Sequence, residues 1–124
     1  MDLSSKIALV TGAGSGIGRA SALALAAAGA DIVVNDIDAS KASAVAGEVE
    51  ALGRRALTSV ASVADYPAVE SMVDSAWSDF GPIDILVNNA GIYLFYDGPF
   101  GDMPLDNWHG ILEVNLHGVF HLSR

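Results

Sequence analysis

The feature that most constrains the fold is an apolar run near the N-terminus that breaks into closely spaced glycines and then continues as an alanine-rich stretch. Residues Ile7–Val10 are aliphatic and bounded by turn-forming residues, which predicts a short strand buried on both faces. Residues 17–28 have high helix propensity and are followed by Gly29, a residue that favours the end of a helix. We therefore predict a strand, a tight loop and a helix in succession.

The loop between this strand and this helix is suited to hold a phosphate group. Its glycines let the backbone turn sharply and approach a ligand with no side chain in the way: Gly12, Gly14, Gly16 and Gly18. The helix that follows directs free N–H groups and a partial positive charge toward the loop. Glycine runs also occur in ordinary tight turns, but the strand before this loop and the helix after it favour a phosphate or pyrophosphate site.

An acidic residue strengthens this interpretation. Asp31–Asp36 is typical of a second buried strand, and Asp36 ends it 18 residues after the last loop glycine. In a strand–helix–strand unit this places a carboxylate beside the first loop, where it accepts hydrogen bonds from a ribose diol and repels a 2′-phosphate. No basic residue follows at Ile37 or Asp38, and Ser15 in the loop is not basic. We therefore predict NAD rather than NADP; an aspartate that merely begins the next turn is the alternative.

Strands and helices continue to alternate along the chain. The spacing of apolar residues predicts a helix at 40–52, a strand at Ala56–Val60, a helix that begins after an Asp65 cap and ends before Gly81, and a strand at 83–87. Such alternation predicts a parallel sheet with helices on both faces. One face of the helix after Asp65 is predicted to lie in the core: Val69, Met72, Val73, Ala76, Trp77 and Phe80.

The chain after residue 87 combines small polar residues, a loop and a final helix. Asn88-Asn-Ala-Gly91 follows the fourth strand, at the end where open α/β sheets bind ligands, although an ordinary turn has a similar composition. Residues 93–104 contain glycines, prolines and four aromatic residues, which predicts a loop that could cover a substrate pocket.

Residues 105–124 are predicted to form one helix with Asn115 in the middle of its apolar face: Trp108, Ile111, Leu112 and Val119. An unsatisfied amide there costs roughly 1–3 kcal/mol, so Asn115 needs partners, and a structural asparagine bridging to backbone satisfies this. His109, Glu113, His117 and His121 recur every four residues on the opposite face. That spacing can hold a metal, but a solvated polar face explains it more simply, and we predict no metal site.

The composition bounds the remaining possibilities. The 124 residues suffice for one domain, and although 52% of them are hydrophobic, no apolar run approaches the roughly 20 residues of a membrane span. A net charge of −9 argues against nucleic acid or an anionic membrane as a partner. The absence of cysteine excludes disulfides and thiolate metal sites and fits a cytoplasmic protein.

Four segments together resemble the short-chain dehydrogenases/reductases: Thr11-Gly-Ala-Gly-Ser-Gly-Ile-Gly18, Asp36, Asn88-Asn-Ala-Gly91 and Val114-Asn-Leu-His-Gly118. The similarity spans residues 6–124. It implies a Rossmann-type NAD-binding domain over 1–124 and an oxidoreductase that moves a hydride between nicotinamide and a small-molecule alcohol or ketone. The cofactor-binding residues that it implies are Gly12, Ser15, Gly16, Ile17, Gly18, Asp36, Ser62, Val63, Asn89, Ala90 and Gly91.

The resemblance also implies a catalytic role for Asn115, because in the family this asparagine perturbs its helix and holds a water molecule of the proton relay. One position departs from the family. Ser62-Val63 falls where the family usually has Asp-Val, whose aspartate contacts adenine, so a weaker contact is expected here.

The family's catalytic Ser and its Tyr-x-x-x-Lys lie further along than residue 124. None of the three tyrosines is followed four residues later by a lysine; the residues found there are Glu70, Asp97 and Phe100. General acid catalysis contributes about 10²–10⁴-fold, so we expect residues 1–124 alone to be inactive. The alternative to an enzyme is a truncated dinucleotide-binding module without catalytic activity.

The same boundary leads to an expectation about assembly. In a sheet ordered 3-2-1-4, truncation after the helix that follows strand 4 leaves 83–87 as an unprotected edge without Lys, Pro or a bulge. The last helix also lacks a neighbour for its apolar face. We therefore predict a homo-oligomer, most simply a two-fold dimer that buries both surfaces.

Overall fold

Four parallel strands form the centre of the fold, which the computed structural model describes for residues 1–124. The strands are β1 (Ile7–Val10), β2 (Asp31–Asp36), β3 (Ala56–Val60) and β4 (Ile85–Val87). Their order in the sheet is β3-β2-β1-β4, and Leu9 of β1 lies opposite both Val33 of β2 and Leu86 of β4. The predicted parallel sheet and its 3-2-1-4 order are therefore confirmed.

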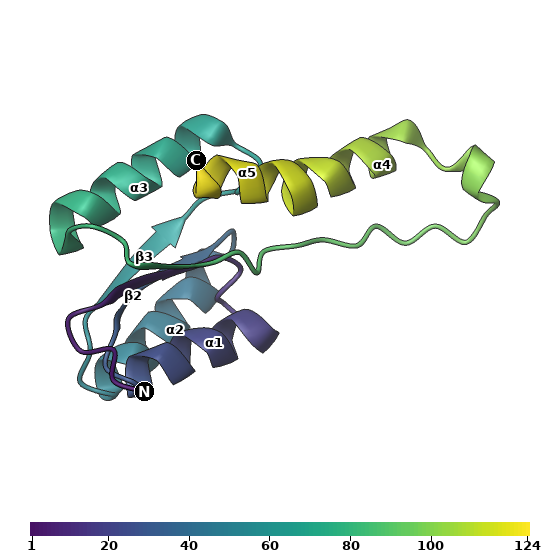
Figure 1. Cartoon of the computed structure of the whole chain (residues 1–124). Coiled ribbons are helices and arrows are strands. Elements are labelled where there is room, and N and C mark those ends of the chain that lie inside the picture. The colour runs from purple at the N-terminus through teal and green to yellow at the C-terminus, as the bar shows by residue number, and fades with distance from the viewer.

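Helices cover both faces of the sheet (Figure 1). Because successive side chains of a strand point to opposite faces, Ala8 and Val10 pack in the cluster that includes the first two helices, while Ile7 and Leu9 pack against the third. The helices on the first face are α1 (Gly16–Ala27) and α2 (Ala39–Ala51), and those on the second face are α3 (Tyr66–Phe80) and α5 (Gly118–Ser123).

Aspartate caps begin two of these helices. Asp38 accepts hydrogen bonds from the backbone N–H groups of Lys41 (3.1 Å) and Ser40 (3.0 Å) at the start of α2. The hydrogen bond from the Lys41 backbone and that from the Ser40 hydroxyl hold the pKa of Asp38 below its usual value. Asp65 accepts a bond of 3.2 Å from the N–H of Ala68, which confirms the predicted cap of α3.

An ion cluster around the buried carboxylate of Asp31 lies at the start of β2. The Asp31 carboxylate accepts hydrogen bonds from the guanidinium groups of Arg54 (2.6 Å) and Arg55 (2.7 Å). Burial by itself raises the pKa of Asp31, but the hydrogen bonds from Arg55 and the charges of both arginines outweigh it and hold that pKa below its usual value. The Arg55 guanidinium also lies 4.4 Å from the ring centroid of Phe80, so the cluster links β2, β3 and α3.

The structure corrects the prediction that Trp77 lies in the core. Met72 is buried, as expected, but Trp77 is 59% exposed. It borders an apolar groove with Ile83, Leu86 and Leu122, beyond the β4 edge, where no further element of the chain covers it. Helical spacing identifies the apolar face of α3, but it does not show how far the sheet extends beneath that face.

The final segment is less regular than the single helix predicted for 105–124. It consists of α4 (Leu105–Leu112), a π-helical turn η2 (Glu113–His117) and α5. The predicted loop 93–104 contains one 3₁₀ turn, η1 (Phe100–Asp102). This loop and α4 project beyond the sheet as an arm (Figure 1). No residue of α4 is fully buried, and on its expected apolar face Trp108 packs edge-on against the ring of Phe100 while Ile111 and Leu112 are only half-buried.

None of the helices combines the length and the apolar character that a membrane span requires.

Candidate functional site

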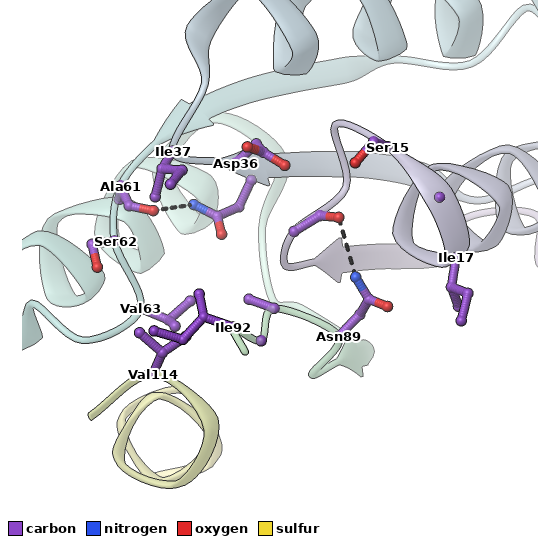
Figure 2. A pocket seen from close by; sticks show the side chains of 15 residues that line it. Ser15, Ile17, Asp36, Ile37, Ala61, Ser62, Val63, Asn89, Ile92 and Val114 are labelled. Atoms are coloured by element: carbon purple, nitrogen blue, oxygen red, sulfur yellow. Dashed lines mark hydrogen bonds between the residues drawn. The ribbon is translucent and has the colours of Figure 1, made fainter. Parts of the chain in front are cut away.

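The carboxyl ends of β1, β2 and β3 and the segment after β4 surround a cavity of about 420 Å³ (Figure 2). Asp36 is the only ionisable residue among those that line it. Every residue predicted to bind a cofactor lines this cavity except Gly18, which packs closely against the backbone of Gly12. The lining residues are Gly12, Ser15, Gly16, Ile17, Asn35, Asp36, Ile37, Ala61, Ser62, Val63, Asn89, Ala90, Gly91, Ile92 and Val114.

The glycine loop has the geometry of an anion cradle. Gly12 and Gly16 have φ values of +60° and +53°, in the left-handed region that side chains disfavour. A Cβ atom on Gly18 would overlap the carbonyl oxygen of Gly12, so only glycine allows α1 to approach the loop this closely. Ser15 precedes α1 without a side-chain cap, which leaves the first N–H groups of the helix available to a ligand. This arrangement fits a pyrophosphate.

Asp36 joins the glycine loop to the end of β2. Its Oδ2 accepts a hydrogen bond of 2.8 Å from the N–H of Gly14, and its Oδ1 accepts one of 3.0 Å from the N–H of Asp38. Each carboxylate oxygen has a second lone pair, so both can still accept a hydrogen bond from a ligand hydroxyl. Asp36 therefore shapes the loop and also offers acceptors to the cavity.

A second set of bonds holds the wall formed by the residues after β4. The buried Thr11 Oγ1 accepts hydrogen bonds from the backbone N–H groups of Asn89 (3.1 Å) and Ala90 (3.0 Å). In return, Asn89 Nδ2 donates to the carbonyl oxygens of Thr11 (3.0 Å) and Gly12 (3.1 Å), and Figure 2 shows Asn89 directed at the glycine loop. The Asn-Asn-Ala-Gly segment thus packs against the backbone of β1 at the edge of the cavity.

The residues after β3 are held by α5. The carbonyl oxygen of buried Val63 accepts a hydrogen bond of 2.8 Å from His121 Nδ1. Gly118 lies so close that a Cβ atom there would come within 2.5 Å of Val63 Cγ2. The hydroxyl of Ser62 accepts from the N–H of Ala64 at 3.3 Å within the same turn. His121 therefore has a structural contact that its predicted place on a solvated face did not indicate.

Asn115 lies in the π-helical turn and contacts the backbone of Ile92, one of the residues that line the cavity. Its Oδ1 accepts a hydrogen bond of 2.8 Å from the N–H of Ile92, and its Nδ2 donates to the carbonyl oxygen of Ile92 at 2.9 Å. The expected bridging to backbone is thus confirmed. Asn115 does not line the cavity, whereas its neighbour Val114 does. Its catalytic role stays a prediction.

The histidines of the last helix do not converge on a common point. His117 Nδ1 lies 3.1 Å from Glu113 Oε2, while His121 turns to the backbone of Val63. No group of three or more His, Cys, Asp or Glu side chains is arranged to hold a metal ion.

The sequence prediction missed five lining residues. Asn35 and Ile37 flank Asp36. Asn35 carries a signal in the sequence, because it is a polar residue inside an aliphatic strand, whereas the 73% exposure of the Ile37 side chain is seen only in the structure. The other three were not predicted, because only the tertiary structure brings them to the cavity, although Val114 begins one of the segments that carry the family resemblance. They are Ala61, Ile92 and Val114.

Comparisons with known proteins agree with this geometry. The family model described as short chain dehydrogenase matches residues 6–124. The 7α-hydroxysteroid dehydrogenase of Escherichia coli is 40% identical over 123 residues, which cover 98% of this chain and 47% of that protein. The chain spans about half the length of the curated relatives it matches.

Two solved structures superpose closely on this fold. One is a 7α-hydroxysteroid dehydrogenase complexed with NADH and 7-oxo glycochenodeoxycholic acid, with a TM-score of 0.90 at 40% identity over 98% of this chain and 47% of that chain. The other is a short chain dehydrogenase from Burkholderia cenocepacia in complex with NADP, with a TM-score of 0.91 at 46% identity over 99% of this chain and 50% of that chain. Similar proteins therefore hold either dinucleotide.

Proposed function

This chain belongs to the short-chain dehydrogenase family, and we propose that it forms the NAD-binding part of an oxidoreductase acting on a small-molecule alcohol or ketone. The observation that carries the proposal is the cavity itself, which combines a glycine cradle with a single carboxylate at the end of β2. When bound, the nicotinamide ring supplies or accepts the hydride. The residues of this chain bind and orient the dinucleotide.

Each part of the cavity has a distinct role in this proposal. The N–H groups at the start of α1 and the glycine backbone hold the pyrophosphate. Asp36 accepts hydrogen bonds from the adenosine ribose through the lone pairs that Gly14 and Asp38 leave free. The wall of Asn89 and Ala90 borders the cavity beside the glycine loop, next to the pyrophosphate.

The charges around Asp36 favour NAD over NADP. A 2′-phosphate carries about −1.5 to −2 charges, and two unit charges about 4 Å apart repel by about 1–4 kcal/mol, depending on solvent screening. No cation lines the cavity to offset this. Lys41 is a nearby basic residue, but its Nζ lies 3.8 Å from the Asp38 carboxylate and its side chain is mostly exposed.

Calorimetric titration of the purified protein with NAD⁺ and NADP⁺ tests the preference. We expect NAD⁺ to bind roughly tenfold more tightly or better, and Asp36→Ala to narrow the difference. Lys41→Ala is the matched control, because it removes a nearby charge that does not line the cavity and should leave the preference for NAD⁺ in place. Equal affinities, or tighter binding of NADP⁺, would contradict the proposed role of Asp36.

A dinucleotide-binding module without activity is the second candidate, and the tyrosines favour it for residues 1–124 taken alone. The Tyr66 hydroxyl donates a hydrogen bond of 2.7 Å to Glu70, and this bond raises the pKa of Tyr66 above its usual value. A proton-relay tyrosine needs the opposite shift. Tyr93 and Tyr96 lie on the projecting arm, and neither is followed four residues later by a lysine. An assay that follows NADH absorbance with a panel of alcohols separates cofactor binding from turnover. Turnover that depends on Asn115 would exclude the hypothesis of a binding module without activity.

We also propose that the protein is a homo-oligomer. Large apolar side chains are exposed along the last helical segment, and β4 forms an edge of the sheet. The exposed side chains are Trp108, Leu116, Val119 and Phe120. A cytoplasmic location, and the absence of nucleic acid or membrane partners, stay predictions from composition.

A further inference from the structure

Asn35 is a buried polar side chain that faces the cavity and that neither the glycine loop nor Asp36 requires. It is only 1% exposed, yet it is one of the residues that line the cavity. Its Nδ2 donates to the carbonyl oxygens of Ser59 (3.3 Å) and Ala61 (3.0 Å), and Figure 2 shows the second of these bonds. Both partners are obligate acceptors, so the amide cannot rotate without placing Oδ1 against them.

The fixed amide leaves one atom without a partner. No donor of the chain reaches Asn35 Oδ1, although buried polar atoms almost always find one. Asn35 Oδ1 is also not completely inaccessible to solvent. Because Asn35 lines the cavity, this oxygen can meet a donor there. The structure therefore holds a preoriented hydrogen-bond acceptor against the ligand space.

The position of Asn35 in the cavity identifies the part of the ligand that it meets. Asn35 is bonded to Ala61, which lies two residues before Val63 in the same segment of the cavity wall. Figure 2 shows Ser15 and Ile17 at one end of the cavity, Asp36 between the ends, and Ile37 with Val63 at the other. In the proposed function, which this inference extends, the pyrophosphate lies at the glycine end and the ribose at Asp36. The base then lies at the far end, where aliphatic side chains suit the faces of a flat ring.

Ser62 is the other polar side chain at the base end. Its hydroxyl already accepts a hydrogen bond from the N–H of Ala64 within its own turn. Asn35 Oδ1 has no such local partner, and its orientation is fixed by two bonds to the neighbouring strand and the residue after it. It is therefore the better-organised acceptor for a donor group on the base.

We propose that Asn35 Oδ1 accepts a hydrogen bond from the exocyclic amine of adenine and is a specificity-determining residue for the base of the dinucleotide. A site built around a polar contact of this kind discriminates strongly against an analogue that lacks the matching group, because the buried acceptor then stays unpaired. Nicotinamide hypoxanthine dinucleotide is such an analogue, since it carries a carbonyl oxygen where adenine has its amine.

Calorimetric binding of NAD⁺ and of nicotinamide hypoxanthine dinucleotide to the purified protein tests the proposal without recourse to activity. We expect the unaltered protein to bind NAD⁺ about tenfold more tightly. In Asn35→Ala this ratio should fall to about one, since neither base finds the acceptor. Ile37→Ala is the matched control: it removes apolar contact at the same end and should weaken both dinucleotides alike, leaving the ratio unchanged.

Each result distinguishes this inference from the proposed function. Similar affinities of the unaltered protein for the two dinucleotides would overturn the role of Asn35 while leaving NAD binding intact, and this comparison holds even if Asn35→Ala fails to fold. A folded Asn35→Ala protein that keeps the tenfold ratio would also overturn it. Failure of the unaltered protein to bind either dinucleotide would instead overturn the proposed function, and this inference with it.

Discussion

Replacing Thr11 by valine should uncouple the glycine loop from the wall that follows β4. The two side chains have nearly the same shape, but valine removes the oxygen that accepts hydrogen bonds from the N–H groups of Asn89 and Ala90. Thr11 is 1% exposed, so water cannot easily replace the lost acceptor. The Asn89 N–H keeps its other hydrogen bond, of 3.0 Å to the carbonyl oxygen of Val87, so only the Ala90 N–H is left without a partner. The substitution therefore isolates the loss of these two bonds from that of packing.

The magnitude follows from these two bonds. The Ala90 N–H left without a partner costs about 1–3 kcal/mol, and the second bond that the Asn89 N–H loses contributes about 1 kcal/mol. The additional methyl group that valine buries regains about 0.8 kcal/mol. We expect a net loss of about 2 kcal/mol in the free energy of unfolding. For a chain of 124 residues this lowers the melting temperature by about 8 °C, at about 4 °C per kcal/mol.

Urea unfolding followed by circular dichroism measures this loss, and Thr11→Ser is the control. Serine keeps the acceptor and loses only a methyl group, so it should cost about 1 kcal/mol. An unchanged m-value shows that the difference lies in stability rather than in the unfolded state. A Thr11→Val protein as stable as Thr11→Ser would refute the argument that Thr11 Oγ1 carries the connection.

Three further predictions concern the ion cluster, the α5 contact and the assembly. The pKa of Asp31 is lowered in the folded state, so the stabilisation that its ionised carboxylate contributes is present at neutral pH and is lost as the pH falls below about 4. In a profile of the free energy of unfolding against pH, Asp31→Asn should therefore flatten the decline at acid pH. An unchanged decline would exclude the ion cluster as its cause. Gly118→Ala should destabilise the protein by about 1–2 kcal/mol despite its gain in helix propensity, because the new methyl group meets Val63. Gly47→Ala, at a position of α2 with open space around it, should instead stabilise the protein by up to about 1 kcal/mol. Thermal unfolding of the two variants measures this difference. Light scattering after size exclusion should show a dimer or larger species, and a monomer at micromolar concentrations would contradict the proposed burial of the last helical segment.

The parts of the fold that sequence predicts well are those set by local periodicity. β1, β2 and β3 have the predicted bounds, because each is an aliphatic run between turn residues. The alternation of strands and helices predicts the parallel sheet, and the glycine loop after β1 is typical of folds with the strand order 3-2-1-4. The cavity lining was also largely predictable, since the glycine loop and Asp36 stand at fixed places in such a unit.

Other features depend on contacts that no local pattern contains. Trp77 has the spacing of a core residue, but the sheet ends at β4 and leaves it exposed. His121 has the spacing of a polar surface residue, yet it binds the Val63 carbonyl, which lies 58 positions earlier in the chain. The π-helical turn similarly coincides with the bonds between Asn115 and Ile92, which join the last helix to the segment after β4.

These long-range contacts explain how the two ends of the cavity are built. The glycine end is held by backbone groups of the loop itself and by the bonds between Thr11 and Asn89. The base end depends on side chains from other elements, because Asn35 fixes the residue after β3 while His121 fixes Val63 two residues later. The glycine end can therefore be recognised in the sequence as a motif, and the base end cannot. We accordingly expect substitutions at Asn35 and along α5 to change how the protein recognises the base of the dinucleotide. Such substitutions should leave the glycine loop, which we propose binds the pyrophosphate, undisturbed.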